Sequence, residues 1–170
     1  MIKATVGARA FRDYAGMVAR LRPRPDRAAM MQVAVDAMWE TLGGRGVSWI
    51  GFYTKAEGRD EMLLQARRDK PACSPIGLHG MCGRCWRERK PIIVKDVATL
   101  GANYIACDPK DRSEVVIPLF EPDGSCWGVL DTDSYEVDSF HDDDVTGLTR
   151  AVERLGLSTP QQPAPYILRL

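Results

Sequence analysis

Residues Glu114–Ser134 read EVVIPLFEPDGSCWGVLDTDS and contain the strongest hairpin signal in the chain. Two runs rich in apolar and β-branched residues, 114–120 and 126–133, flank the turn Pro122-Asp123-Gly124. A turn of this composition between two such runs predicts a β-hairpin. We therefore expect an antiparallel sheet at the centre of the molecule.

The segments around this hairpin predict strands in the middle of the chain and helices toward its ends. Aromatic and β-branched runs predict further strands over residues 47–54, 62–66 and 92–94. Apolar residues at helical spacing predict helices over residues 11–21, 26–42, 82–89 and 139–155. Polar loops are expected over residues 67–80 and 98–112. This order predicts an α+β fold with a mostly antiparallel sheet and helices packed on it.

The chain length and the balance of charges are those of one globular domain without a polyanionic partner. We expect a single domain over residues 1–157 of the 170 and a Pro-rich, extended tail over residues 158–170, lying on a surface or a partner subunit. Lys plus Arg and Asp plus Glu both number 23, whereas nucleic-acid and membrane-surface binders usually carry a basic excess. No apolar run approaches the roughly 18 residues of a membrane span. Met1–Phe11 lacks the apolar core of a secretory signal, so the expected location is the cytoplasm.

Two strands are expected to present functional side chains on one face of the sheet. Because side chains alternate along a strand, Trp49 and Tyr53 share a face with Gly51 between them, either as part of a packed core or as walls of a site. Asp131 and Asp133 are also two residues apart and share a face, and Glu114 opens the neighbouring strand. Clustered carboxylates repel, so at least one pKa should rise and a proton be retained. Such a group can bind an ammonium ion and donate a proton.

The five cysteines are expected to be core residues, metal ligands or catalytic thiols, because a chain of this length does not need disulfides for its stability. Cys82-Gly-Arg-Cys85 is a C-x-x-C motif, compatible with zinc or with a dithiol pair. Zinc would need two further ligands from Cys73, Cys107 and His79, and a second C-x-x-C motif is absent.

The surroundings of the individual cysteines suggest different roles. Cys82 begins a predicted helix, whose dipole is expected to lower the thiol pKa. Near Cys107, Asp108 disfavours a thiolate whereas Lys110 and Arg112 favour it, so the balance stays open. Cys126 is expected in the core.

The remaining thiol and the histidines suggest no further chemistry. Cys85 is either a functional member of the C-x-x-C motif or a bystander on its helix, and the sequence leaves both open. Neither His79 nor His141 has the context of a Cys-His hydrolase.

Six motifs follow one another along the chain: Trp49-Ile-Gly-Phe-Tyr53, Lys70-Pro-Ala-Cys73, Met81-Cys82-Gly83, Ile105-Ala-Cys107-Asp108, Ser113-Glu114-Val-Val-Ile-Pro118 and Gly128-Val-Leu-Asp131-Thr-Asp133-Ser134. In this order they closely resemble the free methionine-(R)-sulfoxide reductases, single-domain proteins of the GAF fold. The resemblance runs from about Trp49 to Asp144. It is specific, because generic GAF modules do not carry the three cysteines and three acids together.

The resemblance implies a role for each matching residue. Cys107 would be the catalytic thiol, and Cys73 and Cys82 the thiols that resolve its oxidised form. The implied substrate-binding residues are Trp49, Tyr53, Glu114, Asp131 and Asp133. The implied fold is a six-stranded antiparallel sheet with packed helices, often as a homodimer.

The chain also departs from the family pattern. The segment between Cys73 and Cys82 is one residue shorter than usual. A glycine-lysine-glycine turn is replaced by Gly77-Leu78-His79-Gly80, and Cys85 and Cys126 are additional.

The expected activity is therefore reduction of free methionine (R)-sulfoxide through a Cys107 sulfenic acid and an intramolecular disulfide. A thioredoxin-like dithiol would be the external reductant, and no bound cofactor or metal is expected. Two alternatives are a non-catalytic GAF sensor of a small ligand or of oxidation, and a structural zinc at Cys73, Cys82, Cys85 and Cys107. The sequence does not decide whether Cys73 or Cys82 is the resolving thiol.

Overall fold

The computed structural model describes residues 9–170, so most of the Met1–Phe11 segment, in which no secretory signal is predicted, lies outside the described residues. The described chain has four α-helices: α1 (Tyr14–Arg20), α2 (Arg27–Leu42), α3 (Met81–Glu88) and α4 (Asp142–Arg154). It has seven strands: β1 (Trp49–Lys55), β2 (Glu61–Arg68), β3 (Ile76–Gly77), β4 (Ile92–Val94), β5 (Ser113–Phe120), β6 (Cys126–Ser134) and β7 (Leu168–Arg169). Two short 3₁₀ turns, over Val97–Thr99 and Gly101–Asn103, lie between β4 and β5.

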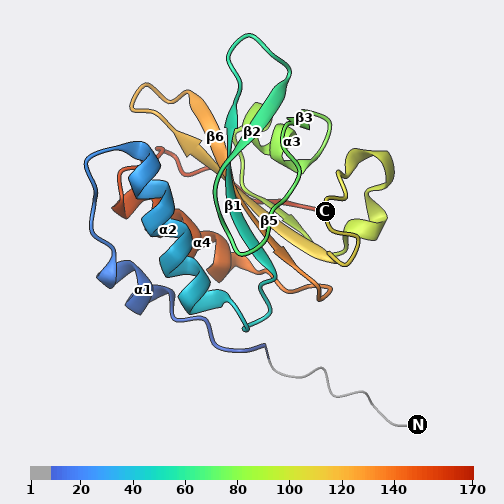
Figure 1. The fold of residues 1–170 in the computed structure, drawn as a ribbon, viewed down its shortest axis with the longest axis horizontal. Coiled ribbons are helices and arrows are strands. Elements are labelled where there is room, and N and C mark those ends of the chain that lie inside the picture. The colour runs from blue at the N-terminus through green and yellow to red at the C-terminus, as the bar shows by residue number, and fades with distance from the viewer. Residues whose placement is uncertain (1–8) are drawn as a thin grey trace.

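The strands form one sheet in the order β3-β2-β1-β6-β5-β4-β7 (Figure 1). The hairpin predicted from residues 114–133 is formed by β5 and β6, and each neighbouring pair is antiparallel except β4 and β7. The predicted mostly antiparallel sheet is confirmed, with seven strands in place of six. The extra pairing comes from β3, inside the segment expected to be a loop, and from β7 in the tail.

Side chains next to the helices explain where α1 and α4 begin. Asp13 accepts a hydrogen bond from the amide of Gly16 at 2.9 Å, so α1 starts after it and not at residue 11. At α4, the Asp144 carboxylate accepts from the backbone amide of His141 at 2.7 Å and forms a capping box, so this helix starts after residue 141.

The two faces of the sheet are covered differently. Helices α1, α2 and α4 lie on one face, where Ile50 and Phe52 of β1 enter the larger apolar core (Figure 1). Helix α3 and the loops around it lie on the other face, where Trp49 and Tyr53 join a second cluster. The alternation of β1 therefore separates a structural face from the face that carries the predicted functional residues.

A buried ion pair joins α1 to α4. The Asp144 carboxylate accepts hydrogen bonds from the Arg12 guanidinium at 2.8 Å and from the Tyr14 hydroxyl at 2.6 Å, and the Arg12 and Asp144 side chains are both fully buried. Burial by itself would raise the pKa of Asp144, but these hydrogen bonds outweigh burial and lower it. The pair fixes α4 against the residues directly before α1.

The C-terminal tail returns to the edge of the sheet. Leu168 pairs in parallel with Ile92, and the Leu170 amide donates to the carbonyl oxygen of Ile93 at 2.9 Å. In return the Lys95 amide donates to the carbonyl oxygen of Leu170 at 2.9 Å. These bonds satisfy backbone groups of β4 that would otherwise form an open edge.

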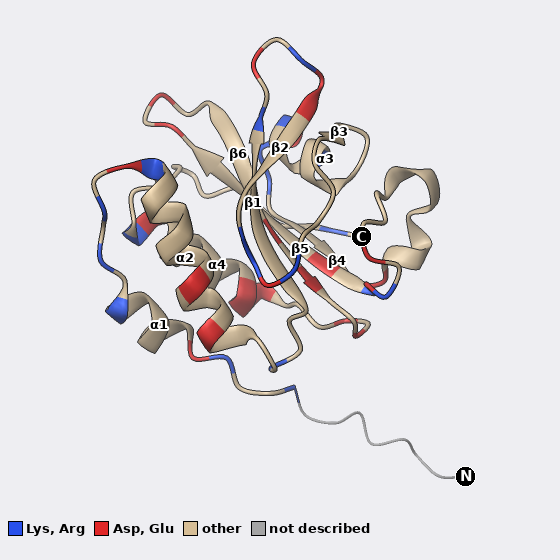
Figure 2. Cartoon of the chain, in the orientation of Figure 1, with Lys and Arg blue, Asp and Glu red and all other residues tan. Residues whose placement is uncertain are grey.

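Charged residues of both signs are spread over helices, strands and loops, as Figure 2 shows. Among residues 9–170, no helix combines the length and the apolar character that crossing a membrane requires.

Candidate active site

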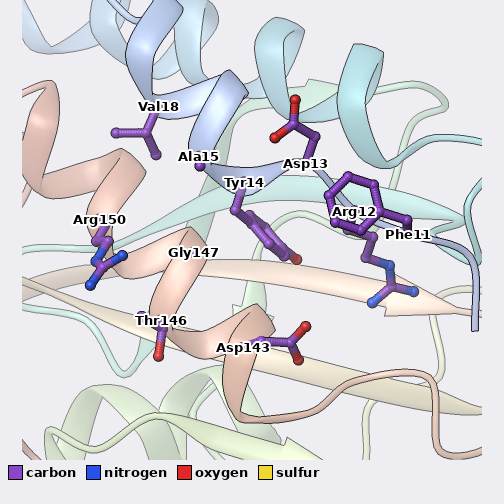
Figure 3. Close-up of a pocket in the computed structure, with 10 residues that line it drawn as sticks. All are labelled: Phe11, Arg12, Asp13, Tyr14, Ala15, Val18, Asp143, Thr146, Gly147 and Arg150. Atoms are coloured by element: carbon purple, nitrogen blue, oxygen red, sulfur yellow. The ribbon is translucent and has the colours of Figure 1, made fainter.

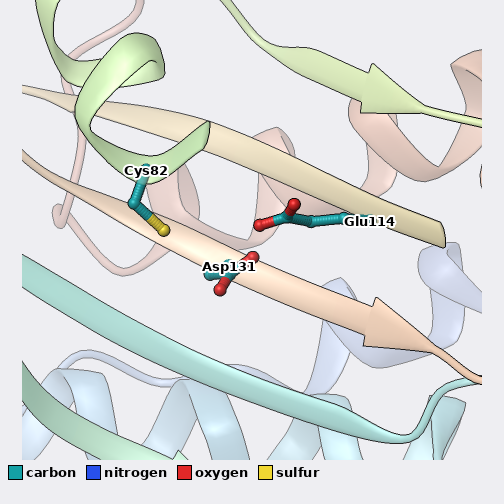
Figure 4. A group of neighbouring side chains, drawn as sticks. All are labelled: Cys82, Glu114 and Asp131. Carbon is teal, nitrogen blue, oxygen red and sulfur yellow. The ribbon is translucent and has the colours of Figure 1, made fainter. Parts of the chain in front are cut away.

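The register of β5 and β6 brings three carboxyl groups to one face of the sheet. Glu114 pairs with Asp133, while Asp131 pairs with Val116 on one side and with Gly51 on the other. Helix α3 lies over this face and directs the Cys82 sulfur at the acids (Figure 4). One atom each of Cys82, Glu114 and Asp131 lies within 4.8 Å of the other two. The shared face predicted from the sequence spacing is thus present.

Two of these carboxyl groups are deeply buried, and each has one unpaired oxygen. Glu114 is 4% exposed and Asp131 is 7% exposed. Within the described chain, Glu114 Oε2 and Asp131 Oδ1 accept no hydrogen bond. Buried polar atoms in proteins are usually paired, so unpaired oxygens in a cluster indicate a place for a bound polar group.

Burial and mutual repulsion keep protons on this group. Loss of solvent, followed by the charge of Asp133, raises the pKa of Glu114 to about 8. The pKa of Asp131 is raised by burial and then by Glu114. The pKa of half-buried Asp133 is raised by loss of solvent and then by Asp131. At neutral pH the site therefore retains at least one carboxylic acid, as the clustering predicts.

The prediction of a lowered pKa for Cys82 is wrong. Cys82 is the second residue of α3, but burial raises the pKa of its thiol well above the usual value, and Asp131 and Glu114 raise it further. The helix dipole is outweighed, because a thiolate there would be a buried anion facing acids. Cys82 is therefore a neutral thiol at the floor of the site.

Cys73 and Cys107 form a disulfide, with their Cα atoms 5.6 Å apart. It connects the Cys73 loop, residues 69–75 between β2 and β3, to the Cys107 loop, residues 104–112 before β5. Both cysteines are solvent-exposed residues. Because these two sulfurs are bonded to each other, the four-cysteine zinc set considered from the sequence is not assembled.

The other two cysteines lie apart from the disulfide. Cys85 is fully buried in α3 as a free thiol. Cys126, expected in the core, is only half-buried, and its thiol donates to the carbonyl oxygen of Gly128 at 3.3 Å. His141 is exposed.

Trp49 and Tyr53 hold the Cys73 loop. The Trp49 indole donates to the carbonyl oxygen of Lys70 at 2.9 Å, and the Tyr53 hydroxyl donates to the carbonyl oxygen of Cys73 at 2.8 Å. The two rings are 6.1 Å apart. A Cβ atom on Gly51 would lie 2.1 Å from the Trp49 ring, so glycine is required there because the indole covers it. The predicted gap between the aromatic residues is filled by the indole.

Cys107 lies between two cavities. The inner cavity, of about 30 Å³, is lined by Tyr53, Cys82, Cys107, Glu114 and Asp131, among others. The outer cavity, of about 260 Å³, is lined by Trp49, Lys70, Cys107, Asp111 and Asp133, among others. The structure thus brings Cys107 to all three predicted acids. The inner space is about that of one water molecule, whereas ligand pockets usually measure at least about 300 Å³.

Sequence reasoning missed the connections of the Cys107 loop. The Asp108 carboxylate contacts the Lys70 ammonium and accepts from the Tyr135 hydroxyl at 2.7 Å. Asp108 was expected to act on Cys107 against Lys110 and Arg112, but its charge is paired with Lys70, and Arg112 lies 3.4 Å from Asp96 instead. The only sequence signal for Lys70 was its place in the motif that ends at Cys73.

Asp111 is a fourth acid that sequence reasoning also missed. It is 7% exposed and lines the outer cavity. Loss of solvent and then the charge of Asp108 raise its pKa to about 6. An acid three residues before Glu114 gave no periodic signal, because it belongs to a loop.

A larger cavity, of about 460 Å³, lies between α1 and α4 (Figure 3). Tyr14 projects into it from α1, and Thr146 and Arg150 face it from α4. It contains no cysteine and none of the predicted site residues. The chemistry-bearing groups therefore place the candidate site on the opposite face of the sheet.

Comparisons with known proteins agree with this geometry. A protein of Dictyostelium discoideum called GAF domain-containing protein A is 36% identical over 108 residues, covering 63% of this chain and 66% of that protein. The free methionine-R-sulfoxide reductase of Saccharomyces cerevisiae is 34% identical over 96 residues, covering 55% of this chain and 53% of the yeast protein. The matches thus span less than two thirds of these relatives.

A solved structure is similar over a larger share. The free methionine-R-sulfoxide reductase of Neisseria meningitidis, in complex with its substrate, is 31% identical with a TM-score of 0.71, covering 85% of both chains. The chain also matches the GAF domain family over residues 25–157, which include the whole sheet except β7 and all the site residues. This chain therefore belongs to the GAF domain family.

Proposed function

We propose that this protein reduces free methionine (R)-sulfoxide to methionine. The observation that supports this proposal most strongly is the position of Cys107, which lines one cavity with Glu114 and Asp131 and the other with Asp133. A nucleophilic sulfur beside carboxylic acids that retain a proton can transfer oxygen from a sulfoxide. The similarity to proteins named as free methionine-R-sulfoxide reductases supports the substrate class.

The first step uses a thiolate as nucleophile and a carboxylic acid as proton donor. The Cys107 thiolate attacks the sulfoxide sulfur, and a protonated carboxyl group of the Glu114–Asp131 pair donates its proton to the sulfoxide oxygen. The oxygen passes to Cys107 as a sulfenic acid and methionine leaves. The substrate sulfur gains two electrons and the cysteine sulfur loses two, so the step is balanced.

The second step removes the oxygen as water. The Cys73 thiol attacks the sulfenic acid of Cys107, which forms the disulfide and releases water. We assign Cys73 and not Cys82 as the resolving thiol, because Cys73 is bonded to Cys107 in the structure while Cys82 is a free, neutral thiol at the acids. A thioredoxin-like dithiol then reduces the exposed disulfide by exchange.

The remaining site residues would bind the amino acid. Asp131 and Asp133 can accept hydrogen bonds from its ammonium group, and Trp49 and Tyr53 provide aromatic surface for the S-methyl group. Because the inner cavity holds about 30 Å³ in the disulfide form, binding would require the reduced form, in which the Cys73 and Cys107 sulfurs are no longer bonded to each other. A homodimer, thioredoxin dependence and residence in the cytoplasm stay predictions.

The test is an NADPH-coupled thioredoxin assay on the separated (R) and (S) epimers of free methionine sulfoxide, with dithiothreitol as a second reductant. Wild-type protein should consume NADPH with the (R) epimer. Cys107→Ser should abolish turnover, whereas Cys126→Ser, which changes a thiol outside both cavities, should retain it. Full turnover by Cys107→Ser would overturn the assignment. Calorimetry that showed tight binding of the sulfoxide without any turnover would favour a GAF sensor instead.

A further inference from the structure

We infer that Lys70, Asp108 and Tyr135 form a clasp that positions Cys107 against Cys73 when both thiols are reduced. The clasp is defined as these three side chains, which come from the Cys73 loop, the Cys107 loop and the segment after β6. Its effect on thiol pairing does not depend on the proposed substrate. Its consequence for the resolving step rests on the proposed function.

Asp108 is the centre of the clasp. Its carboxylate contacts the Lys70 ammonium and accepts a hydrogen bond from the Tyr135 hydroxyl at 2.7 Å, and Lys70 also contacts that hydroxyl. The Lys70 nitrogen lies 4.9 Å from the centre of the Tyr135 ring, a cation–π distance. Charge-assisted hydrogen bonds that share one acceptor reinforce one another's geometry. Asp108 thus connects three segments at the residue next to Cys107.

The Cys73 side of the clasp is already fixed to the sheet. The Trp49 indole holds the carbonyl oxygen of Lys70, and the Tyr53 hydroxyl holds that of Cys73. Both donors are buried residues of β1. The backbone at Lys70 and Cys73 is therefore held by two bonds that do not involve the disulfide.

The Cys107 side depends on Asp108. Over residues 104–110 the other hydrogen bonds within the described chain are local: the Tyr104 amide donates to Gly101, and the amides of Lys110 and Asp111 donate back to Asp108. Among the side chains of residues 104–110, only that of Asp108 hydrogen-bonds to other segments, whereas Tyr104 and Ile105 make apolar contacts with the second cluster. When the disulfide is opened, the clasp is the polar connection that keeps this part of the loop beside Cys73.

Asp108 is suited to this role over a wide pH range. The hydrogen bond from Lys70 contributes most to lowering the pKa of Asp108, followed by the bond from the Lys110 amide. Its other neighbours are the Tyr135 hydroxyl and two acids, Asp111 and Asp133, whose pKa values the Asp108 charge helps to raise. The Lys110 ammonium lies 5.9 Å from the centre of the Tyr135 ring and adds positive charge nearby. The carboxylate therefore stays charged wherever the thiols are reactive.

A clasp of this kind should raise the effective concentration of one thiol toward the other. In a glutathione buffer, the protein dithiol and oxidised glutathione give the protein disulfide and two reduced glutathiones, so the equilibrium constant measures that effective concentration. Coupling is reciprocal: if disulfide and clasp stabilise each other, removal of the clasp must favour the dithiol.

The test measures this equilibrium by trapping thiols with an alkylating reagent and quantifying Cys73 and Cys107 by mass spectrometry. Asp108→Asn should lower the effective concentration about three- to tenfold, the range that loss of one ordinary, partly exposed hydrogen bond produces. Tyr135→Phe keeps the charges of Lys70 and Asp108 and should also lower the effective concentration. This variant therefore distinguishes positioning of the thiols from a change in thiol acidity. Asp96→Asn, which removes the Arg112 ion pair near the other end of the Cys107 loop, is the matched control and should leave it unchanged.

An equilibrium within twofold of wild type in both Asp108→Asn and Tyr135→Phe would overturn the proposal. So would an equal loss of folding stability in the oxidised and reduced proteins without a shift of the equilibrium, because that result would make the residues merely structural. The measurement contains no sulfoxide, so its outcome is independent of the reductase activity. With an active enzyme, Asp108→Asn should also prolong the life of the Cys107 sulfenic acid, trapped with dimedone, without slowing the release of the first methionine.

Discussion

Glu114 on β5 and Asp133 on β6 lie directly opposite each other, and their side chains share one face of the sheet. Like charges in such a cross-strand pair repel each other, and here burial adds to the repulsion. The protein therefore folds most easily with a proton on this group. Both the pH dependence of stability and that of catalysis follow from this arrangement.

Stability should fall as the pH rises from about 4.5 to about 8. The pKa of Glu114 is raised from 4.5 to about 8 on folding, so in this window the folded protein keeps a proton that the unfolded chain has released. For one proton the slope is up to about 1.4 kcal/mol per pH unit. Urea unfolding across this window should show the decline, and Glu114→Gln should reduce its slope by up to the contribution of one proton, while Asp131 and Asp133, whose pKa values are also raised, sustain the remainder. Exposed Glu57→Gln should keep the wild-type slope.

Reductase activity should decline as the pH rises through about 8, because the acid that protonates the sulfoxide oxygen is then lost. Glu114→Gln should reduce kcat/KM about 10²- to 10⁴-fold and remove this decline. The measurement is kcat/KM against pH with the (R) epimer. A variant that kept both the wild-type rate and the wild-type profile would exclude Glu114 as the proton donor.

Single-turnover experiments should distinguish the roles of Cys73 and Cys82. Without external reductant, Cys82→Ser should release one methionine per chain and still form the Cys73–Cys107 disulfide, because the two paired sulfurs are unchanged. Cys73→Ser should release one methionine but leave the Cys107 sulfenic acid exposed to dimedone. Mass spectrometry reads both outcomes. A disulfide between Cys82 and Cys107 in the wild-type protein would reverse the assignment of the resolving thiol.

Tyr53→Phe should loosen the Cys73 loop, because it removes the hydrogen bond to the carbonyl oxygen of Cys73. The expected cost is about 1 kcal/mol of unfolding free energy. Disulfide formation after a single turnover should slow more than methionine release does. Tyr104→Phe is the comparison, since Tyr104 lines the same inner cavity without holding that loop.

Asp144→Asn should be the most destabilising of these changes, because it leaves the Arg12 guanidinium buried without its counter-ion. Breaking a buried pair typically costs about 3–5 kcal/mol. Since the pKa of Asp144 is lowered on folding, its contribution is present above its usual pKa of 3.8 and lost as the pH falls below it. Asp143→Asn, on an exposed pair with Arg9, should change stability by less than about 1 kcal/mol. Denaturant unfolding compares the two.

The face shared by the acids could be predicted, because the period of two along a strand places Asp131 and Asp133 together and the Pro-Asp-Gly turn brings Glu114 beside them. The strands β3 and β7 could not be predicted, because two residues are too few to show alternation of apolar and polar side chains. The pKa of Cys82 was predicted in the wrong direction, because helix position can be read from a sequence but the burial that outweighs it cannot. The clasp joins residues 70, 108 and 135, whose proximity no spacing reveals.

The two faces of β1 have a consequence for mutational scanning. Ile50 and Phe52 point into the helix-covered core, whereas Trp49, Gly51 and Tyr53 lie under the cysteine loops. Substitutions at the even-numbered positions should therefore reduce the cellular abundance of the protein, and activity only in proportion. Substitutions of the two aromatic residues at odd-numbered positions should reduce activity per folded molecule. A mutational scan that records both abundance and activity would therefore show the two effects alternating from residue to residue along β1.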